Sequence, residues 1–491
     1  MDASAAAPSL GDMRIARSSS PWLSSLAVLN VLVLAAAALA LAVPGALNTS
    51  DMMLGVLVIA YLVVLWYLRA RHPDDLVEMD TLFFAFFGIY VVLPIVAFVI
   101  WQAIGDAPPF IHLVTHFESS VVTVAAAALL SLLLGYSSPI GPAFARLMPR
   151  TDGTWSRGEG LAISWGLLLV GAALVAILVQ MVGLETLTES EYARGYEATA
   201  GLGILAGGLM LIQIGLVVLY LSMASRGRRT PILPWILFAV LALLMLRIGR
   251  RRVVLEMGLA LVVAHHFYVR KIRFRTLAVG GAAALLVFAA VGLARTYLAE
   301  GLGGILSRLV EEFGLSEVLR LMAEPVTVLL ALSETMYQVP GQEPFWMGRS
   351  FIEAFEILIP LPLHPSRPLG PSQWFVNLID PAIAAAGGGY SYALLAEGYL
   401  NFGMLGVVVV SFLEGTIVRG VVVYRRLCPS SQSRILIYAI AASLTVLMIR
   451  GDFASLLKAG IVGLAVPTVL IAAWLGRRRT SPTSIEHTIT A

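Results

Sequence analysis

The feature that most constrains this chain is a series of about twelve apolar segments, most of them long enough to cross a lipid bilayer as helices. A hydrocarbon core of about 30 Å requires roughly 20 apolar residues in a helix. Hydrophobic residues make up 59% of the chain and charged residues only 13%, against about 25% charged residues in soluble proteins. We therefore predict an all-α polytopic integral membrane protein that forms one domain over 1–491, with spans near 22–43, 52–69, 81–101, 118–136, 160–182, 201–224, 232–247, 253–269, 276–294, 404–424, 435–450 and 454–475.

Basic residues occur in every second connection between these segments. Lysine and arginine collect in cytoplasmic loops, so this pattern predicts that both termini are cytoplasmic, including a tail over 476–491. It also makes the first apolar segment a signal anchor. The basic residues on the predicted cytoplasmic side are Arg14, Arg17, Arg69, Arg71, Arg146, Arg150, Arg157, Arg226, Arg228, Arg229, Arg270, Lys271, Arg273, Arg275, Arg425, Arg426, Arg434, Arg477, Arg478 and Arg479.

One arginine cluster lies on the predicted outer side, against this bias. The sequence at 247–252 is Arg-Ile-Gly-Arg-Arg-Arg. Charged residues at a membrane are costly and are usually retained for function, so we expect this cluster to bind an anionic group. Arginines that extend to the membrane interface without a ligand are the alternative.

The longest predicted outer connection, 295–401, lies between the ninth and tenth spans. Long loops are usually functional or disordered. Residues 302–322 have the apolar periodicity of a helix lying on the membrane surface, 325–338 is too short to cross the bilayer, and 351–359 is a helix ended by prolines. We predict interfacial and re-entrant helices here, followed by a rigid proline-rich loop over 364–371.

Glycines are frequent at the end of this connection. Three consecutive glycines at 387–389 allow the backbone to approach a ligand or to turn sharply. The following segment, 393–424, is too long for one straight span, and Gly398 and Gly403 predict a break where the chain enters the membrane. Glu397 would then lie at the outer rim.

Together these features resemble the Wzy-type oligosaccharide repeat unit polymerases, the O-antigen polymerases of bacterial surface polysaccharide synthesis. The resemblance rests on Glu-Tyr-Ala-Arg-Gly-Tyr at 191–196, the cluster at 247–252, the long loop, the stretch 389–406 and Arg-Gly-Asp-Phe at 450–453. It implies a C-type membrane glycosyltransferase that transfers repeat units between undecaprenyl-diphosphate-linked oligosaccharides, donor and acceptor, at the outer leaflet of the bacterial inner membrane. The product would be O-antigen, capsular polysaccharide or exopolysaccharide. Partners that set chain length and flip the precursor are implied by the family alone.

Such a reaction requires positive charge where the leaving diphosphate gains negative charge. Guanidinium groups supply it through bidentate hydrogen bonds in a dry site, and arginine keeps its charge at any working pH. The candidate diphosphate-binding residues, all at predicted outer ends of spans, are Arg247, Arg250, Arg251, Arg295 and Arg450.

The acceptor sugar hydroxyl is a poor nucleophile, which a general base would activate. Glu397 is the leading catalytic candidate because it precedes the predicted break, and Asp452 and His364 are the others. Ion pairs with arginines are the structural alternative for the two acids, and His364 has the alternative of an ordinary loop residue. Aromatic rings stack on sugars, although tyrosines are also common at membrane interfaces. The predicted glycan-binding residues are Tyr192, Arg194, Tyr390 and Tyr399.

Several motifs are absent from the sequence. It contains no Asp-x-Asp pair for a metal with a nucleotide sugar, no Gly-x-x-x-x-Gly-Lys phosphate loop and no metal-spaced His and Cys set, so we predict neither a metal nor a cofactor. The single cysteine, Cys428, cannot form an internal disulfide. Many C-type glycosyltransferases place a catalytic acid in the first outer loop, which here contains only Asp51.

Two other functions remain open from the sequence. An O-antigen ligase would share the topology and the clustered arginines but would deliver the glycan to lipid A core. A lipid-linked oligosaccharide flippase or transporter would be expected to contain two related halves, which the sequence does not show. The net charge of +3 gives no indication of nucleic acid as a partner, and membrane lipid is the expected surrounding.

Overall fold

The regular structure of the chain is helical throughout the described residues, as the sequence predicts. The chain contains two compact units, Met1–Ala60 and Tyr61–Ala491, and their boundary falls within helix α2 (Thr49–Arg71). The computed structural model describes residues 49–71, 75, 77–96, 98, 119–149, 151, 155–183, 205, 207–224, 230–247, 250–273, 276–277, 279–281, 323–359, 363–385 and 389–477.

Six helical segments in these ranges are long and apolar enough to cross a membrane. They are Met79–Val96, Ser120–Ser137, Arg157–Val182, Leu394–Leu427, Gln432–Arg450 and Phe453–Leu475. Shorter apolar helices lie at Leu54–Leu68, Gly208–Met223 and Leu233–Leu246. The chain is therefore a polytopic helical membrane protein, whereas the count of about twelve spans stays a prediction. The predicted span 22–43 and most of 276–294 lie outside the described residues.

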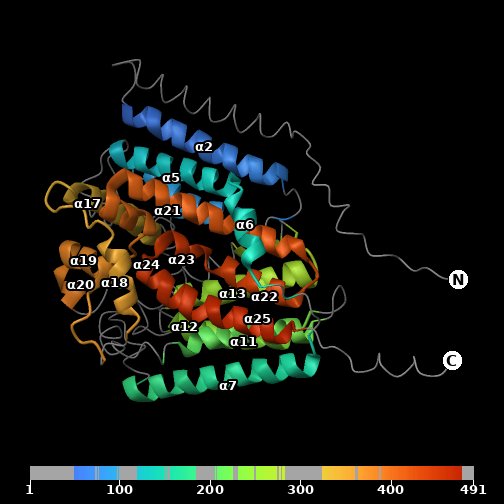
Figure 1. Ribbon diagram of the computed structural model, residues 1–491. Helices are drawn as coiled ribbons and strands as arrows, with labels where there is room; N and C mark the ends of the chain where they lie inside the picture. Colours follow the sequence, from blue (N-terminus) through green and yellow to red (C-terminus); the bar gives the residue numbers. More distant parts are fainter. Residues whose placement is uncertain are drawn as a thin grey trace, which may run out of the picture. The chain divides into compact units, whose positions relative to one another are not determined.

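Helices α5 (Ser119–Ser137) and α21 (Leu394–Leu427) lie side by side in the second unit (Figure 1). Glycines allow their backbones to approach closely. A Cβ added at Gly135 would lie 2.0 Å from the Phe412 carbonyl oxygen, and one added at Gly415 would lie 2.1 Å from that of Leu132. Small residues are typical of contacts between membrane helices, because close van der Waals packing replaces the hydrophobic effect there.

The remaining long helices pack mostly against helices near them in the chain, and α13 also packs against the distant α22. Helix α7 contacts α11, α11 contacts α13, and α13 contacts both α12 and α22 (Figure 1). Their bounds, with those of the other membrane segments, are α3 (Met79–Phe87), η1 (Gly88–Val92), α6 (Ile140–Leu147), α7 (Arg157–Val182), α11 (Gly208–Met223), α12 (Leu233–Arg247), α13 (Arg251–Tyr268), α22 (Gln432–Ser443), α23 (Thr445–Arg450), α24 (Phe453–Ser455), η4 (Leu456–Ala465) and α25 (Val466–Leu475).

The described part of the predicted long loop contains four short helices, α17 (Ala323–Gln338), α18 (Arg349–Ile357), α19 (Gly370–Ile379) and α20 (Pro381–Ala385). The first two correspond to the helices predicted at 325–338 and 351–359, whereas 302–322 lies outside the described residues. The prediction that 364–371 is irregular throughout is wrong at its end, because Gly370 and Pro371 begin α19. Proline is favourable in the first turn of a helix, where its missing N–H has no partner to lose.

Helix α21 contains the break that its length and glycines predict. Phe402 (φ −139°, ψ 17°) and Gly403 (φ 60°, ψ −142°) are not helical, and the Gly403 conformation is essentially restricted to glycine. The predicted break is therefore confirmed at Gly403. Gly398 instead remains helical. The missing side chain at Gly406 allows the two halves to touch, since a Cβ added at Gly406 would lie 1.9 Å from the Gly398 carbonyl oxygen.

Four connections that contain predicted cytoplasmic basic residues meet at the other end of α21. Hydrogen bonds and ion pairs join them in the described part of the chain, and Arg425 and Ser431 lie at the end of α21 and just beyond it. The contacts are Ser431 Oγ to the Thr151 carbonyl oxygen at 2.5 Å, Lys271 Nζ to Asp75 Oδ1 at 2.9 Å and Arg425 Nη2 to Glu78 Oε1 at 2.5 Å.

Candidate active site

The break in α21 is held by the segment that leads into α18. In an unbroken helix the carbonyl groups of Leu400 and Asn401 would accept hydrogen bonds from N–H groups four residues later. Here they accept instead from the backbone N–H groups of Trp346 (3.1 Å) and Met347 (3.0 Å). Backbone polar groups inside a membrane protein need such partners, so the loop and the break stabilise each other.

Asn401 connects this loop to the rest of the site. Its Oδ1 accepts from the Gly348 N–H at 2.9 Å, and its Nδ2 donates to Ser350 Oγ at 2.7 Å and to the Glu397 carbonyl oxygen at 2.9 Å. The side chain is fully buried. All its hydrogen-bonding groups are therefore used to fix the first turn of α18 against the helical turn that contains Glu397.

Glu397 lies one turn before the break and is fully buried. Its Oε1 accepts from the Ser350 hydroxyl and its Oε2 from the Phe453 N–H, both at 2.6 Å. Among the described residues it has no ion-pair partner. The carboxyl group thus joins α18, α21 and α24 through neutral donors, which offset less of the cost of burying a charge than a guanidinium would.

Asp452 lies close enough to Glu397 for its charge to act on that carboxyl group. Its Oδ1 accepts from the Ser455 N–H at 2.8 Å and so caps the N-terminus of α24. Its Oδ2 accepts a short hydrogen bond from the Ser372 hydroxyl on α19. The predicted alternative of an ion pair with Arg450 does not form. The structure therefore brings two buried acids together between α18, α19, α21 and α24.

Arg450 lies two residues before Asp452 and close to the arginine cluster. Its Nη2 donates to Ser391 Oγ at 2.7 Å, and its guanidinium carbon lies 6.0 Å from the centre of the Tyr90 ring. Arg252 pairs with Glu256 at 3.2 Å, and the charges of Arg252 and Arg450 both act on Glu256 and on Tyr90. Arg252 was not among the residues that the sequence singled out, although it belongs to the predicted cluster.

The other predicted diphosphate-binding residues are placed only in part. Arg250 and Arg251 are half-buried at the start of α13. Arg247 ends α12, and its side chain lies outside the description. The described residues also do not include Arg295, Tyr192 and Arg194.

The remaining sequence candidates lie in other contacts. His364 Nε2 is 3.6 Å from Glu356 Oε2 on α18, and no interaction in the described residues joins it to the two buried acids. The Tyr390 hydroxyl donates to Asp380 Oδ2 at 3.2 Å. Burial raises the pKa of Tyr390, and the charge and hydrogen bond of Asp380 raise it further. Tyr399 is half-buried on α21.

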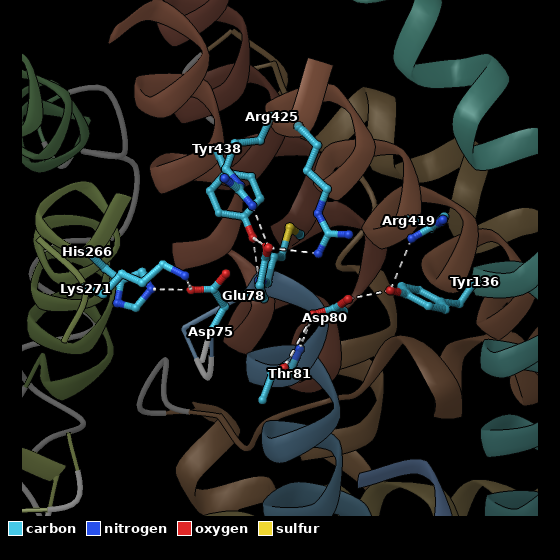
Figure 2. Close-up of polar contacts among 12 residues, drawn as sticks. Asp75, Glu78, Asp80, Thr81, Tyr136, His266, Lys271, Arg419, Arg425 and Tyr438 are labelled. Carbon is cyan, nitrogen blue, oxygen red and sulfur yellow. Dashed lines mark hydrogen bonds and ion pairs between the residues drawn. The ribbon is translucent and has the colours of Figure 1, made fainter. Parts of the chain in front are cut away.

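A second polar cluster surrounds Glu78 at the opposite end of α21, and sequence reasoning did not find it. Figure 2 shows the Glu78 carboxylate beside Arg425 and Tyr438. Arg425 Nη2 and Arg426 Nη2 lie 2.5 and 2.9 Å from Glu78 Oε1, and the Tyr438 hydroxyl donates to Oε2 at 2.5 Å. The same hydroxyl accepts from the Met79 N–H at 2.7 Å. This buried charge is therefore matched by two cations.

Two further acids extend this cluster (Figure 2). Asp80 accepts a short hydrogen bond from the Tyr136 hydroxyl and one from the Thr81 N–H at 2.8 Å. Asp75 lies 3.3 Å from His266 and 2.9 Å from Lys271. The available signal was three acids over 75–80, just before a predicted span and on the predicted basic side. No group of three or more His, Cys, Asp or Glu side chains in the described ranges is arranged to hold a metal ion.

The fold and site define an all-helical, polytopic membrane protein with two buried acids and nearby arginines around a break in one membrane-crossing helix. The family described as O-antigen polysaccharide polymerase Wzy matches residues 161–478, and the chain belongs to this family. The resemblance seen in the sequence motifs is thereby confirmed. The matched range contains both buried acids and Arg450. No curated protein and no solved structure matches the chain.

Proposed function

We propose that this protein transfers glycan repeat units from one undecaprenyl-diphosphate carrier to the sugar end of another at the outer leaflet of the bacterial inner membrane. The observation that carries this proposal is the hydrogen bond between Glu397 and a hydroxyl group, with the Asp452 carboxyl group close by and Arg450 two residues before Asp452 in the chain. Glu397 Oε1 accepts a hydrogen bond from the Ser350 hydroxyl at 2.6 Å. A carboxylate at this distance from a hydroxyl oxygen has the geometry that a general base needs.

The reaction requires one proton transfer and one leaving group. Glu397 takes the proton of the acceptor hydroxyl as the oxygen forms a bond to the anomeric carbon of the donor. The bond from that carbon to the donor diphosphate breaks, and its electron pair leaves with the diphosphate. Arg450 and the cluster at 247–252 stabilise the charge that develops there, and no metal is required for this step.

Ser350 occupies the position that the acceptor hydroxyl would take. Its hydroxyl donates to Glu397 Oε1 from the first turn of α18, a short helix whose outer residues are exposed. Displacement of this turn by the acceptor sugar would replace one hydroxyl by another at the same carboxylate oxygen. Asp452 then serves to position α24 and the Phe453 N–H that holds the second oxygen of Glu397.

The proposed orientation follows from the two ends of α21. Basic connections meet at the Arg425 end, and basic loops are typically cytoplasmic. The Glu397 end would then face the periplasm, with both termini in the cytoplasm. Tyr390 lies just before α21 and Tyr399 lies near its start, where the Tyr399 ring packs edge-on against Phe345, and we infer that the glycan passes these two rings.

The test is polymerisation by the purified protein in detergent, with the lipid-diphosphate-linked repeat unit extracted from its own host as substrate. Wild type should produce a regular ladder on a gel. Glu397→Gln and Arg450→Ala should lose it by at least about 100-fold, the usual contribution of a general base or of one preorganised donor. Matched controls at the other end of the molecule are Glu159→Gln and Arg477→Ala, which should retain the ladder.

Other outcomes would contradict the proposal in distinct ways. Wild type that forms no ladder but transfers glycan to a lipid A core acceptor would be an O-antigen ligase. Transport of the intact precursor across a vesicle membrane without a new bond would identify a flippase. A ladder of normal intensity from Glu397→Gln would remove Glu397 as the base and leave Asp452 and His364 to be tested in the same assay.

A further inference from the structure

The proposed reaction uses two lipid-linked substrates in the same leaflet. The donor diphosphate leaves its sugar, whereas the acceptor diphosphate stays attached at the far end of its repeat unit from the reacting hydroxyl. One anion site cannot hold both headgroups at once. The charges of Arg252 and Arg450 both act on Tyr90 and Glu256, and Arg450 precedes Asp452 by two residues, so these two arginines suit the leaving group. A second site is needed for the acceptor.

A second pair of cations is formed by Lys458, which follows Asp452 in the chain, and Arg367, which follows α18. Lys458 is exposed on the π-helical segment η4, and its ammonium group has no acidic partner among the described residues. The charge of Arg367 acts on it. Two like charges held near each other without an acid destabilise the protein, and a bound anion would remove that cost. Such π-helical segments are also frequent at functional sites.

Arg367 is fixed in place by the C-terminal end of α18. Its Nη1 donates to the carbonyl oxygens of Ile357 (3.0 Å) and Ile359 (2.9 Å), where a cation is favourable. Ile357 packs against the apolar cluster that contains Leu457, the residue next to Lys458. One apolar cluster therefore joins the carbonyl group that holds Arg367 to the residue that precedes Lys458. The other N–H groups of the guanidinium are not used by any described residue.

On the C-terminal side of Lys458 the same helical segment has an exposed apolar face. Ile461, Val462 and Val466 follow it at helical spacing and are 40 to 49% exposed. On α18, Ile352 and Phe355 are also exposed. In a candidate membrane span such side chains contact lipid tails. Lys458 thus lies at the N-terminal end of a row of exposed apolar side chains. This arrangement would bind an amphiphile with an anionic headgroup.

We propose that Lys458 and Arg367 bind the diphosphate of the acceptor carrier, while its polyprenyl chain lies along η4 and α25. This inference rests on the proposed function, because that function requires two carriers. A diphosphate esterified at both ends carries about two negative charges, which match the two cations, whereas a phosphatidylglycerol headgroup carries one. The contacts of Arg450 go to different elements from those of Lys458, so both sites can be filled together.

The experiment counts bound lipid. Purified full-length protein in detergent is saturated with undecaprenyl diphosphate, freed of unbound lipid, and analysed for lipid bound per protein. Wild type should hold two molecules, Lys458→Gln one, and Lys458→Arg two. The matched control is Lys271→Gln, an exposed lysine at the other end of α21, which should hold two. In the ladder assay, Lys458→Gln should raise the KM for the lipid-linked repeat unit, which serves as both donor and acceptor, by roughly tenfold, the effect of one lost charge-assisted contact.

Three results would overturn the proposal. They are a single bound molecule in wild type, two bound molecules in Lys458→Gln, and displacement of the second molecule by an equal concentration of phosphatidylglycerol, which would make this a general phospholipid site. A protein that binds two carriers through Lys458 but forms no ladder would support this site and contradict the proposed polymerase function.

Discussion

Two buried glutamates lie at opposite ends of α21, and their surroundings differ. Glu397 is bound by one hydroxyl and one backbone N–H, and its charged neighbour is another acid. Glu78 is bound by two guanidinium groups and a phenol. About 40 Å of helix separates Glu397 from Arg425, the partner of Glu78. At the Arg425 end of this helix a buried carboxylate is paired with cations, whereas at the Glu397 end the buried carboxyl group has only neutral donors.

The different surroundings of Glu78 and Glu397 suit different roles, a stabilising role for Glu78 and a chemical role for Glu397. A buried carboxylate with matched cations joins segments far apart in the chain, here the start of α3 and the end of α21, and both of its oxygens already accept from strong donors. A buried carboxylate held by weak neutral donors can exchange one of them for a substrate hydroxyl. The membrane makes the unmatched arrangement costly, so its presence at the break in α21 favours a chemical role there.

The largest expected effect is at the matched end. Glu78→Ala would leave Arg425 and Arg426 without their buried anion, which typically costs 3–5 kcal/mol. We expect a large loss of monodisperse protein in detergent and a strongly lowered unfolding temperature. Glu159→Ala, whose partner Arg477 lies 3.5 Å away at the surface, serves as the control and should be nearly neutral. A normal unfolding temperature for Glu78→Ala would remove the distinction between the two glutamates.

A sharper comparison removes one hydroxyl from each glutamate. Tyr438→Phe should cost about 1.5–3 kcal/mol of stability, because the lost hydrogen bond is to a matched, ionised group. Ser350→Ala should cost only about 1 kcal/mol and should keep most polymerase activity, because the acceptor hydroxyl replaces that of Ser350. Chemical unfolding in detergent and the ladder assay measure the two effects. If Ser350→Ala loses most of its polymerase activity together with its stability, Ser350 is only structural.

The break itself provides the next test. Gly403→Ala would place a side chain at φ 60° and ψ −142°, a conformation that costs on the order of 1–3 kcal/mol for other residues, and its Cβ would meet the Phe345 ring at 3.1 Å. We expect lower stability and a weaker ladder, since the break positions Glu397. Gly166→Ala on α7 is the control, because a Cβ there meets no atom within 4 Å, and it should be neutral or slightly stabilising.

Much of the architecture was predictable, because membrane helices can be recognised in a sequence by their length and apolar composition. The break at Gly403 followed from a segment too long for one span. Glu397 and Asp452 were named from the sequence and lie close together in the structure, and Arg450 precedes Asp452 by two residues. Their roles stay predictions. His364 was named because histidine titrates near neutral pH, but that property says nothing of where its loop places it, which is beside Glu356.

The polar partners could not be predicted in the same way. Ser350, Ser372 and Asn401 reach the site from α18, α19 and α21. No local sequence pattern predicts that a serine will donate a hydrogen bond to a carboxylate far away in the chain. The Glu78 cluster joins residues 347 positions apart, and its acids read as ordinary boundary residues until the tertiary contacts are known. The span count stays a prediction, because six helices in the described part of the chain are long and apolar enough to cross a membrane, three further apolar helices there are shorter, and the predicted span 22–43 lies outside the described residues.

The smallest expected effect lies at the edge of the Glu78 cluster. Burial alone would raise the pKa of Asp75, but the hydrogen bonds and charges of Lys271 and His266 lower it below the ordinary value of 3.8. A lowered pKa stabilises the fold at neutral pH, and this contribution is lost as the pH falls through and below about 4. Asp75→Asn should therefore reduce stability by at most about 1 kcal/mol at pH 7, because Lys271 is largely exposed. The difference between the unfolding temperatures of the variant and wild type should shrink as the pH falls below about 4, and a difference that grows with acidity would show that Asp75 is not held in its ionised form.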